Sequence, residues 1–254
     1  MLERSVDIAT ADGTMPVFVT CPESGGPFAP VVLFMDIWGF RELLRDIARR
    51  IGTVGYAAVV PNFYYRAGGV SFDHRLPDGR TRSLIDLPQA DKDEIFAVRR
   101  HLTDDMVIAD CAALLAFFDA DGTIRGGPVG SMGWCMGGRH VIRAAGALAE
   151  RFRATVSLHP TELVGEDGPG AACRDAPRCA GEVYIGYGER DPYTPPRVVE
   201  TVGAAFAAAP AGFEHIVHAG ARHGYAIPDR DVFDKHAAAR DWERAFAIYR
   251  RVLD

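Results

Sequence analysis

Residues 133–138 read Gly-Trp-Cys-Met-Gly-Gly and separate a short apolar run from an amphipathic stretch that begins near residue 138. The pattern places a nucleophile between glycines at a strand-to-helix junction. Glycines are needed because the nucleophile occupies a tight turn in which larger neighbours would clash. We therefore predict that Cys135 stands above a sheet at a helix N-terminus, which favours a thiolate. A buried structural cysteine in a glycine-rich turn is the alternative.

On both sides of this stretch, short apolar runs alternate with longer segments of helical period, which predicts an α/β fold. We expect a doubly wound, mostly parallel sheet flanked by helices in three layers, as one domain over 1–254. Residues 64–105 do not fit the alternation and are expected to form a polar excursion over the sheet edge, and 159–179 a loop. The expected strands are 15–20, 31–35, 57–60, a short one within 127–133, 154–158, 183–186 and 213–218, and the expected helices are 42–51, 106–118, 138–151, 196–208 and 237–253.

Two further residues complete a possible nucleophile, base and acid set. Asp191 follows the strand expected at 183–186, and His223 follows the last strand. Nucleophile, acid and histidine occur in this order in doubly wound hydrolases, each in a loop after a strand. We therefore predict that His223 is the base for Cys135 and that Asp191 orients it. Taken singly, each could be an ordinary loop residue.

The strand expected at 31–35 ends in Asp36 and Ile37, close to the predicted nucleophile. The backbone N–H groups of Ile37 and Met136 are the predicted oxyanion hole. Asp36 is then a carboxylate at the mouth of the site. It could keep the thiol neutral until substrate arrives, or only bond the backbone of its own turn.

Together, the blocks 36–39, 55–64, 133–138, 189–192 and 222–225 resemble the dienelactone hydrolase family, in family order and over nearly the whole chain. The resemblance implies an α/β-hydrolase fold and a Cys135, His223 and Asp191 triad. It also implies a thioacyl-enzyme mechanism on an enol lactone or ester, without metal or cofactor. The family archetype has Glu at the position of Asp36. A thioesterase or broad carboxylesterase is one alternative, and a non-hydrolytic thiol-sensing or small-molecule-binding protein is another.

Several aromatic and basic side chains are candidates for a substrate pocket. The archetype holds its substrate carboxylate with arginines, one of them shortly after the histidine. Here 224–228 are apolar or aromatic, and Arg230 comes only further on. We therefore expect a pocket wall without a fixed cation and a preference for neutral substrates, unless Arg82 or Lys92 reaches in from the excursion. The pocket candidates are Trp38, Tyr64, Tyr65, Trp134, Tyr225, Arg82 and Lys92.

Composition excludes several other classes of protein. The 254 residues are 48% hydrophobic and 24% charged, as in globular proteins, and the net charge of −6 disfavours nucleic acid as a partner. No apolar stretch approaches the roughly 18 residues of a membrane helix, and the N-terminus does not resemble a signal peptide. We expect a cytoplasmic monomer or weak homodimer that acts on a small ester or lactone. No metal site is expected, since the scattered cysteines and His140, His159, His215 and His218 lack ligand spacing.

Overall fold

The computed structural model describes residues 1–165 and 168–254. The described residues form an eight-stranded sheet in the order β1-β2-β4-β3-β5-β6-β9-β10, and β7 and β8 pair in a small antiparallel ribbon. The β1–β2 and β2–β4 pairs are antiparallel, and every other neighbouring pair in the large sheet is parallel. The strands are β1 (Leu2–Thr10), β2 (Gly13–Cys21), β3 (Pro30–Phe34), β4 (Ala57–Pro61), β5 (Val129–Trp134), β6 (Phe152–Leu158), β7 (Val164–Gly165), β8 (Gly168–Pro169), β9 (Glu182–Arg190) and β10 (Gly212–Arg222).

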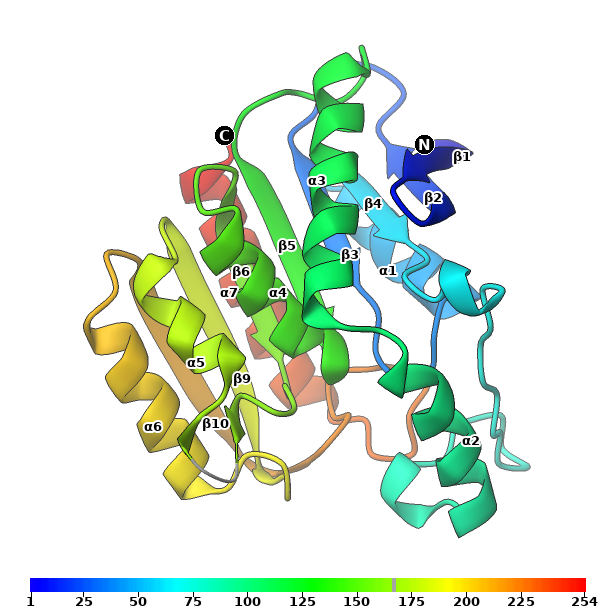
Figure 1. Ribbon diagram of the computed structural model, residues 1–254, viewed down its shortest axis with the longest axis vertical. Helices are drawn as coiled ribbons and strands as arrows, with labels where there is room; N and C mark the ends of the chain where they lie inside the picture. Colours follow the sequence, from blue (N-terminus) through cyan, green and yellow to red (C-terminus); the bar gives the residue numbers. More distant parts are fainter. Residues whose placement is uncertain (166–167) are drawn as a thin grey trace.

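Helices cover both faces of the sheet and make three layers. In Figure 1, α3 and α4 lie in front of the central strands, whereas α1 and α7 lie behind them. Strands β3, β4 and β5 are buried along their whole length, because a parallel sheet covered on both faces has no solvent side. The predicted doubly wound fold is confirmed. The helices are α1 (Glu42–Gly52), α2 (Gln89–Arg100), α3 (Asp104–Ala120), α4 (Met136–Ala147), α5 (Ala171–Asp175), α6 (Pro196–Ala207) and α7 (Lys235–Val252).

The structure adds three features to the predicted elements. Strand β1 pairs with β2 at the sheet edge, and its alternating exposed positions concealed it in the sequence. The segment expected as a loop at 159–179 contains the short helix α5. Helix α3 begins at Asp104, before the expected start, because the Thr103 side chain accepts a hydrogen bond from the Met106 N–H group.

The excursion at 64–105 is more ordered than a polar loop. It contains α2 and two short 3₁₀ turns, Tyr65–Ala67 and Leu84–Asp86. It is joined to the loop after β10, where the Thr81 N–H group donates to the carbonyl of Asp229 over 2.6 Å. In return, the Asp231 N–H group donates to the Thr81 carbonyl over 3.1 Å. A segment far away in sequence is thereby held against the loop that follows His223.

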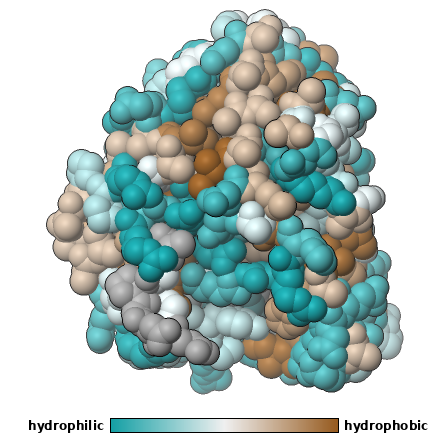
Figure 2. Space-filling view, in the orientation of Figure 1, coloured by the Kyte–Doolittle hydropathy of each residue, from teal (hydrophilic) through white to brown (hydrophobic). Residues whose placement is uncertain are grey.

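Figure 2 shows the surface of the face viewed in Figure 1. It is mainly hydrophilic, with a hydrophobic strip in its upper half, beside α3. No described helix is both long and apolar enough to cross a membrane.

Candidate active site

Cys135 occupies the sharp turn between β5 and α4. Its backbone has φ 56° and ψ −117°, a conformation that is rare for residues other than glycine. Hydrogen bonds hold this turn: the Cys135 N–H group donates to the Leu158 carbonyl over 3.1 Å, and the Cys135 carbonyl accepts from the N–H groups of Gly138 and Thr161. The side chain is buried, and Cys135 is the N-cap of α4, so its position at the start of a helix is the predicted one.

The glycines of the 133–138 stretch are required by close backbone contacts. A Cβ atom on Gly133 would lie 2.3 Å from the Gly137 carbonyl oxygen, and one on Gly137 would lie 2.2 Å from the Phe34 carbonyl oxygen. Neither neighbour is a flexible side chain, so no substitution fits without moving the backbone. The glycines therefore allow the β5–α4 turn to pack directly on β3.

His223 and Asp191 meet beside this turn. Asp191 directly follows β9, and its Oδ2 atom lies 2.7 Å from Nδ1 of His223, which directly follows β10. The other oxygen, Oδ1, accepts a hydrogen bond from the Tyr193 N–H group over 2.9 Å. The Tyr193 ring packs edge-on against the imidazole, with 4.7 Å between ring centroids. The imidazole is therefore oriented by hydrogen bonding on one edge and by packing on its face.

Electrostatics in this cluster favour a charged His223. Burial by itself lowers the pKa of the imidazole. The negative charge of Cys135 and the hydrogen bond to Asp191 outweigh burial and raise the pKa of His223 to about 10. This result links His223 to both Asp191 and Cys135, as transfer of the thiol proton to the imidazole requires.

The predicted oxyanion donors also lie at the nucleophile. Ile37 and Cys135 line the same cavity, and Met136 is the first residue of α4, where an N–H group has no partner within the helix. The loop that carries Ile37 is held in place, because the Tyr64 hydroxyl donates to the Ile37 carbonyl over 3.2 Å. Tyr64 also contacts the sulfur of Met136 at 3.7 Å. Tyr64 thus supports both donor segments.

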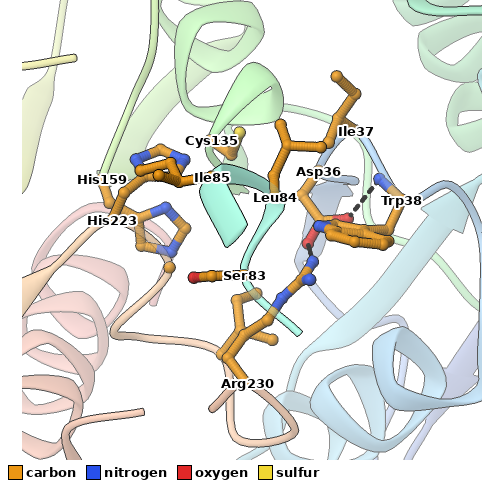
Figure 3. Close-up of a pocket in the computed structure, with 12 residues that line it drawn as sticks. Asp36, Ile37, Trp38, Ser83, Leu84, Ile85, Cys135, His159, His223 and Arg230 are labelled. Atoms are coloured by element: carbon orange, nitrogen blue, oxygen red, sulfur yellow. Dashed lines mark hydrogen bonds and ion pairs between the residues drawn. The ribbon is translucent and has the colours of Figure 1, made fainter. Parts of the chain in front are cut away.

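Cys135 lies where two small cavities meet. The first is lined by Cys135 and His223, and residues 83–85 of the excursion form part of its wall (Figure 3). The second lies on the Met136 and Tyr193 side. Ile37, Leu84 and Cys135 line both, so a ligand could extend to either side of the thiol. The first cavity is lined by Asp36, Ile37, Trp38, Ser83, Leu84, Ile85, Cys135, His159, His223, Gly224, Ile227 and Arg230.

Asp36 is part of a buried ion cluster. Its two oxygens accept from Arg41 over 2.7 and 2.9 Å, and Oδ2 also accepts from Nη2 of Arg230 over 2.9 Å. Burial favours the neutral acid, but the two guanidinium groups outweigh it and lower the pKa of Asp36 to about 2. Oδ1 also accepts from the Trp38 N–H group. Within the described residues, every recorded hydrogen bond of this carboxylate goes to these three residues.

The expected pocket wall without a fixed cation is wrong. Arg230 is 4% exposed, lines the first cavity and packs its guanidinium over the Trp38 ring at 4.1 Å. In the sequence, Arg230 lies beyond the apolar stretch 224–228. The chain returns after Pro228 and is fixed by its hydrogen bonds to the excursion, which directs Arg230 back into the site.

The other pocket candidates divide clearly. Trp38 lines the first cavity, whereas Tyr64 lies behind the Ile37 loop. The remaining five lie outside the lining of both cavities at Cys135. The Tyr65 hydroxyl bonds Thr10 and Asp110, Trp134 is buried in the core, the Tyr225 hydroxyl donates to Asp241, Arg82 is exposed, and Lys92 donates to the Ile85 carbonyl.

Several residues of the site have little or no signal in the sequence. His159 directly follows β6, and that position was an available signal because the carboxyl ends of parallel strands share one edge. Ser83, Leu84 and Ile85 come from the excursion and carry no local signal of their own. Arg41 and Tyr193 also enter the site only through the fold.

Comparison with known proteins identifies the family of this chain. The model of the dienelactone hydrolase family matches residues 15–253. A proposed carboxymethylenebutenolidase of Methylorubrum extorquens is 26% identical over 247 residues, which cover 96% of this chain and 79% of that protein. Another from Escherichia coli K12 is 26% identical over 251 residues, covering 96% and 85%.

Solved structures show the same fold. A proposed dienelactone hydrolase from Klebsiella pneumoniae superposes with a TM-score of 0.82 at 24% identity, covering 98% of both chains. A dienelactone hydrolase-like promiscuous phosphotriesterase from metagenomic libraries has a TM-score of 0.77 at 21% identity, covering 99% of this chain and 98% of the other. The fold, the family model and the relatives together define an α/β-hydrolase that acts on ester bonds. The chain belongs to the dienelactone hydrolase family.

Proposed function

We propose that this hydrolase cleaves an ester or enol-lactone bond through a Cys135, His223 and Asp191 triad and a thioacyl-enzyme intermediate. One observation carries the proposal. Cys135 stands at φ 56° on the β5–α4 turn, in the same cavity as a histidine whose far nitrogen is 2.7 Å from a buried carboxylate. A strained nucleophile turn next to an oriented base is the arrangement that acyl transfer needs.

In the first half-reaction, Nε2 of His223 accepts the thiol proton and Sγ of Cys135 attacks the carbonyl carbon. The carbonyl π electrons move to the oxygen, and the N–H groups of Ile37 and Met136 hold the resulting oxyanion. When the intermediate collapses, the carbon–oxygen single bond breaks. The leaving oxygen takes the proton from His223, which yields the thioester. In a lactone the leaving oxygen stays attached through the opened ring.

In the second half-reaction, His223 accepts a proton from water while the water oxygen bonds the thioester carbon. The same two N–H groups hold the second oxyanion. Collapse breaks the carbon–sulfur bond, the carboxylic acid leaves, and the thiolate of Cys135 and the protonated His223 remain as the pair that meets the next substrate. Asp191 keeps the imidazole in the required tautomer throughout by accepting from its Nδ1 N–H group.

We further propose that the substrate carries an acidic group close to Arg230. Asp36 engages one of its terminal nitrogens, whereas Nη1 is buried and has no recorded partner among the described residues. A buried donor without a partner is costly unless a ligand supplies an acceptor. A matched lactone acid and its methyl ester test this, and the acid should have the higher kcat/KM. Arg230→Gln should reduce that preference, and Arg230→Lys, which keeps the charge, should retain part of it.

The decisive experiment for the proposed function compares wild type with Cys135→Ala on enol lactones, aryl esters and thioesters. Hydrolysis should be lost in the variant with the melting temperature preserved. Intact-mass analysis of quenched wild type should show one acyl group on Cys135. Cys135→Ser should also be poor, since the hydroxyl is the weaker nucleophile at neutral pH. Near-normal turnover by Cys135→Ala would reject the mechanism, and stoichiometric labelling of wild type without turnover would favour a thiol sensor.

The expected partner is therefore the small substrate itself, and we propose a monomer or weak homodimer. A cytoplasmic location is part of the same proposal. It is supported by five free cysteines, which are typical of a reducing compartment.

A further inference from the structure

His159 is a buried histidine of the cavity to which the proposed mechanism assigns no role. It is 1% exposed and lines the cavity beside Cys135 and His223 (Figure 3). Neither of its ring nitrogens has a hydrogen-bond partner among the described residues. Buried polar groups without partners are rare in folded proteins, and each costs about 1–3 kcal/mol. Packing alone therefore gives no reason for an imidazole at this position.

The backbone at His159 is also strained. Its φ is 35°, in the left-handed region that side chains other than Gly, Asn and Asp seldom adopt. Hydrogen bonds on both sides impose this conformation. The His159 N–H group donates to the Gly186 carbonyl over 2.8 Å, and the Thr161 N–H group donates to the Cys135 carbonyl over 3.2 Å. The side chain is thus fixed relative to the nucleophile turn itself.

The ring lies on the side of the base. His159 packs edge-on against His223, with 5.1 Å between centroids, and against Tyr225 at 5.4 Å. In Figure 3 the two imidazoles lie on one side of Cys135, and Ile37 lies on the other. A group that hydrogen-bonds His159 is therefore close to the base His223 and away from Ile37, the proposed donor to the oxyanion.

His159 is held neutral by its surroundings. Burial lowers its pKa well below the ordinary value, and the positive charges of His223 and Arg230 act in the same direction against the opposing charge of Asp36. A neutral imidazole offers one donor and one acceptor. Water matches both, whereas an ester or lactone carbonyl can only accept.

We propose that His159 binds the water that hydrolyses the acyl-enzyme on Cys135. This inference rests on the proposed function. A ring nitrogen of His159 either donates its N–H to the water oxygen or accepts a hydrogen bond from one water O–H. In both cases a free O–H of the water points at Nε2 of His223. His223 takes that proton, the water oxygen bonds the thioester carbon, and the carbon–sulfur bond breaks on collapse. His159 exchanges no proton in this step and only holds the water in line.

The test separates acylation from deacylation with p-nitrophenyl acetate, whose leaving group needs no proton. His159→Phe should acylate within about twofold of wild type but turn over roughly tenfold more slowly, the loss expected for one hydrogen bond in a transition state. Acyl-Cys135 in quenched samples should therefore rise above the wild-type fraction. His159→Asn should recover part of the turnover, because Asn keeps a donor and an acceptor and tolerates positive φ. Melting temperatures of both variants control for folding.

Three outcomes are informative. Unchanged turnover in His159→Phe would overturn the role of His159. Slower turnover without a higher acylated fraction would overturn it as well, since acylation would then be the impaired step. Turnover by wild type without any acyl group on Cys135 would instead reject the proposed function, which distinguishes the two failures. If His159→Phe does not fold, His159→Gly takes its place, because Gly removes the imidazole and accepts the positive φ; unchanged turnover and acylated fraction in that variant would overturn the role of His159.

Discussion

Two histidine–aspartate pairs with the same hydrogen-bond length belong to strand β10 and the loop after it. His223 lies 2.7 Å from Asp191, and His218 lies 2.7 Å from Asp241. The aspartate of each pair is almost completely buried, and each pair joins residues far apart in sequence. Judged by hydrogen-bond length alone, the two pairs are equivalent.

Their surroundings differ. Asp241 on α7 also accepts from the hydroxyls of Tyr184 over 2.6 Å and Tyr225 over 2.8 Å, so this pair is enclosed by aromatic donors in the core. The imidazole of His223 instead faces a cavity that contains Cys135. The difference shows that a histidine–aspartate pair becomes a candidate base only through what its second nitrogen meets. The first pair serves chemistry in our proposal, and the second serves packing.

The largest expected effect is on ester hydrolysis, which should depend on the His223–Asp191 pair and not on the His218–Asp241 pair. Asp191→Asn should lower kcat/KM by about 10³ to 10⁴, since the imidazole loses its orienting carboxylate and tautomer. Asp241→Asn should stay within about tenfold of wild type at 25 °C, because it touches no reacting atom. Esterase kinetics on purified, folded variants measure both. Equal losses of kcat/KM in the two variants would contradict the separate roles of the two pairs.

Stability should show the opposite order. Asp241→Asn should lower the free energy of unfolding by about 3 kcal/mol or more, because it breaks a buried network with several donors. Asp191→Asn should cost less, since its partner faces a cavity. Urea denaturation of both variants gives the comparison. A larger loss of unfolding free energy in Asp191→Asn than in Asp241→Asn would contradict the structural role given to the His218–Asp241 pair.

The thiolate should account for much of the altered titration of His223. Its pKa is raised to about 10, and after burial, which acts against the charged form, the negative charge of Cys135 is the main cause. Removing a negative charge destabilises imidazolium, so Cys135→Ala should shift the His223 titration down toward the ordinary value near 6.5. NMR titration of the imidazole measures this. A midpoint that does not move would uncouple His223 from Cys135.

Asp36 is a third buried aspartate, and its partners are arginines instead of a histidine. Its replacement has the smallest expected effect, a change in the pH dependence of stability. Its pKa is lowered from 3.8 to about 2 by Arg41 and Arg230, which outweigh burial. Such a group stabilises the fold above its unfolded pKa, and this stabilisation is lost as the pH falls through the folded value. Wild type should therefore lose about 2 kcal/mol relative to Asp36→Asn between pH 4 and pH 2. Parallel pH profiles of the two unfolding free energies would contradict this.

Sequence patterns were informative where a single local rule applied. The 133–138 turn needs glycines at fixed positions, and Asp191 and His223 each follow a strand directly, so their meeting at one sheet edge could be expected. Prediction was poor where position depends on a long chain return. Arg230 was discounted because it lies seven residues after His223, yet the loop folds back over Asp36.

The sequence by itself indicated most strands of the large sheet and most of the long helices, because periodicity acts over a few residues. It also indicated the family, by resemblance, and the three residues proposed as nucleophile, base and acid, by their motifs and order. Only the tertiary structure decided which charges share the cavity and that residues 83–85 of the excursion line it. It also decided that the His159 ring lies beside His223 without a hydrogen-bond partner among the described residues. The physical reason is the distance along the chain over which each interaction acts. Hydrogen-bond periodicity and glycine geometry act over a few residues, whereas burial and charge pairing depend on segments that only the folded chain brings together.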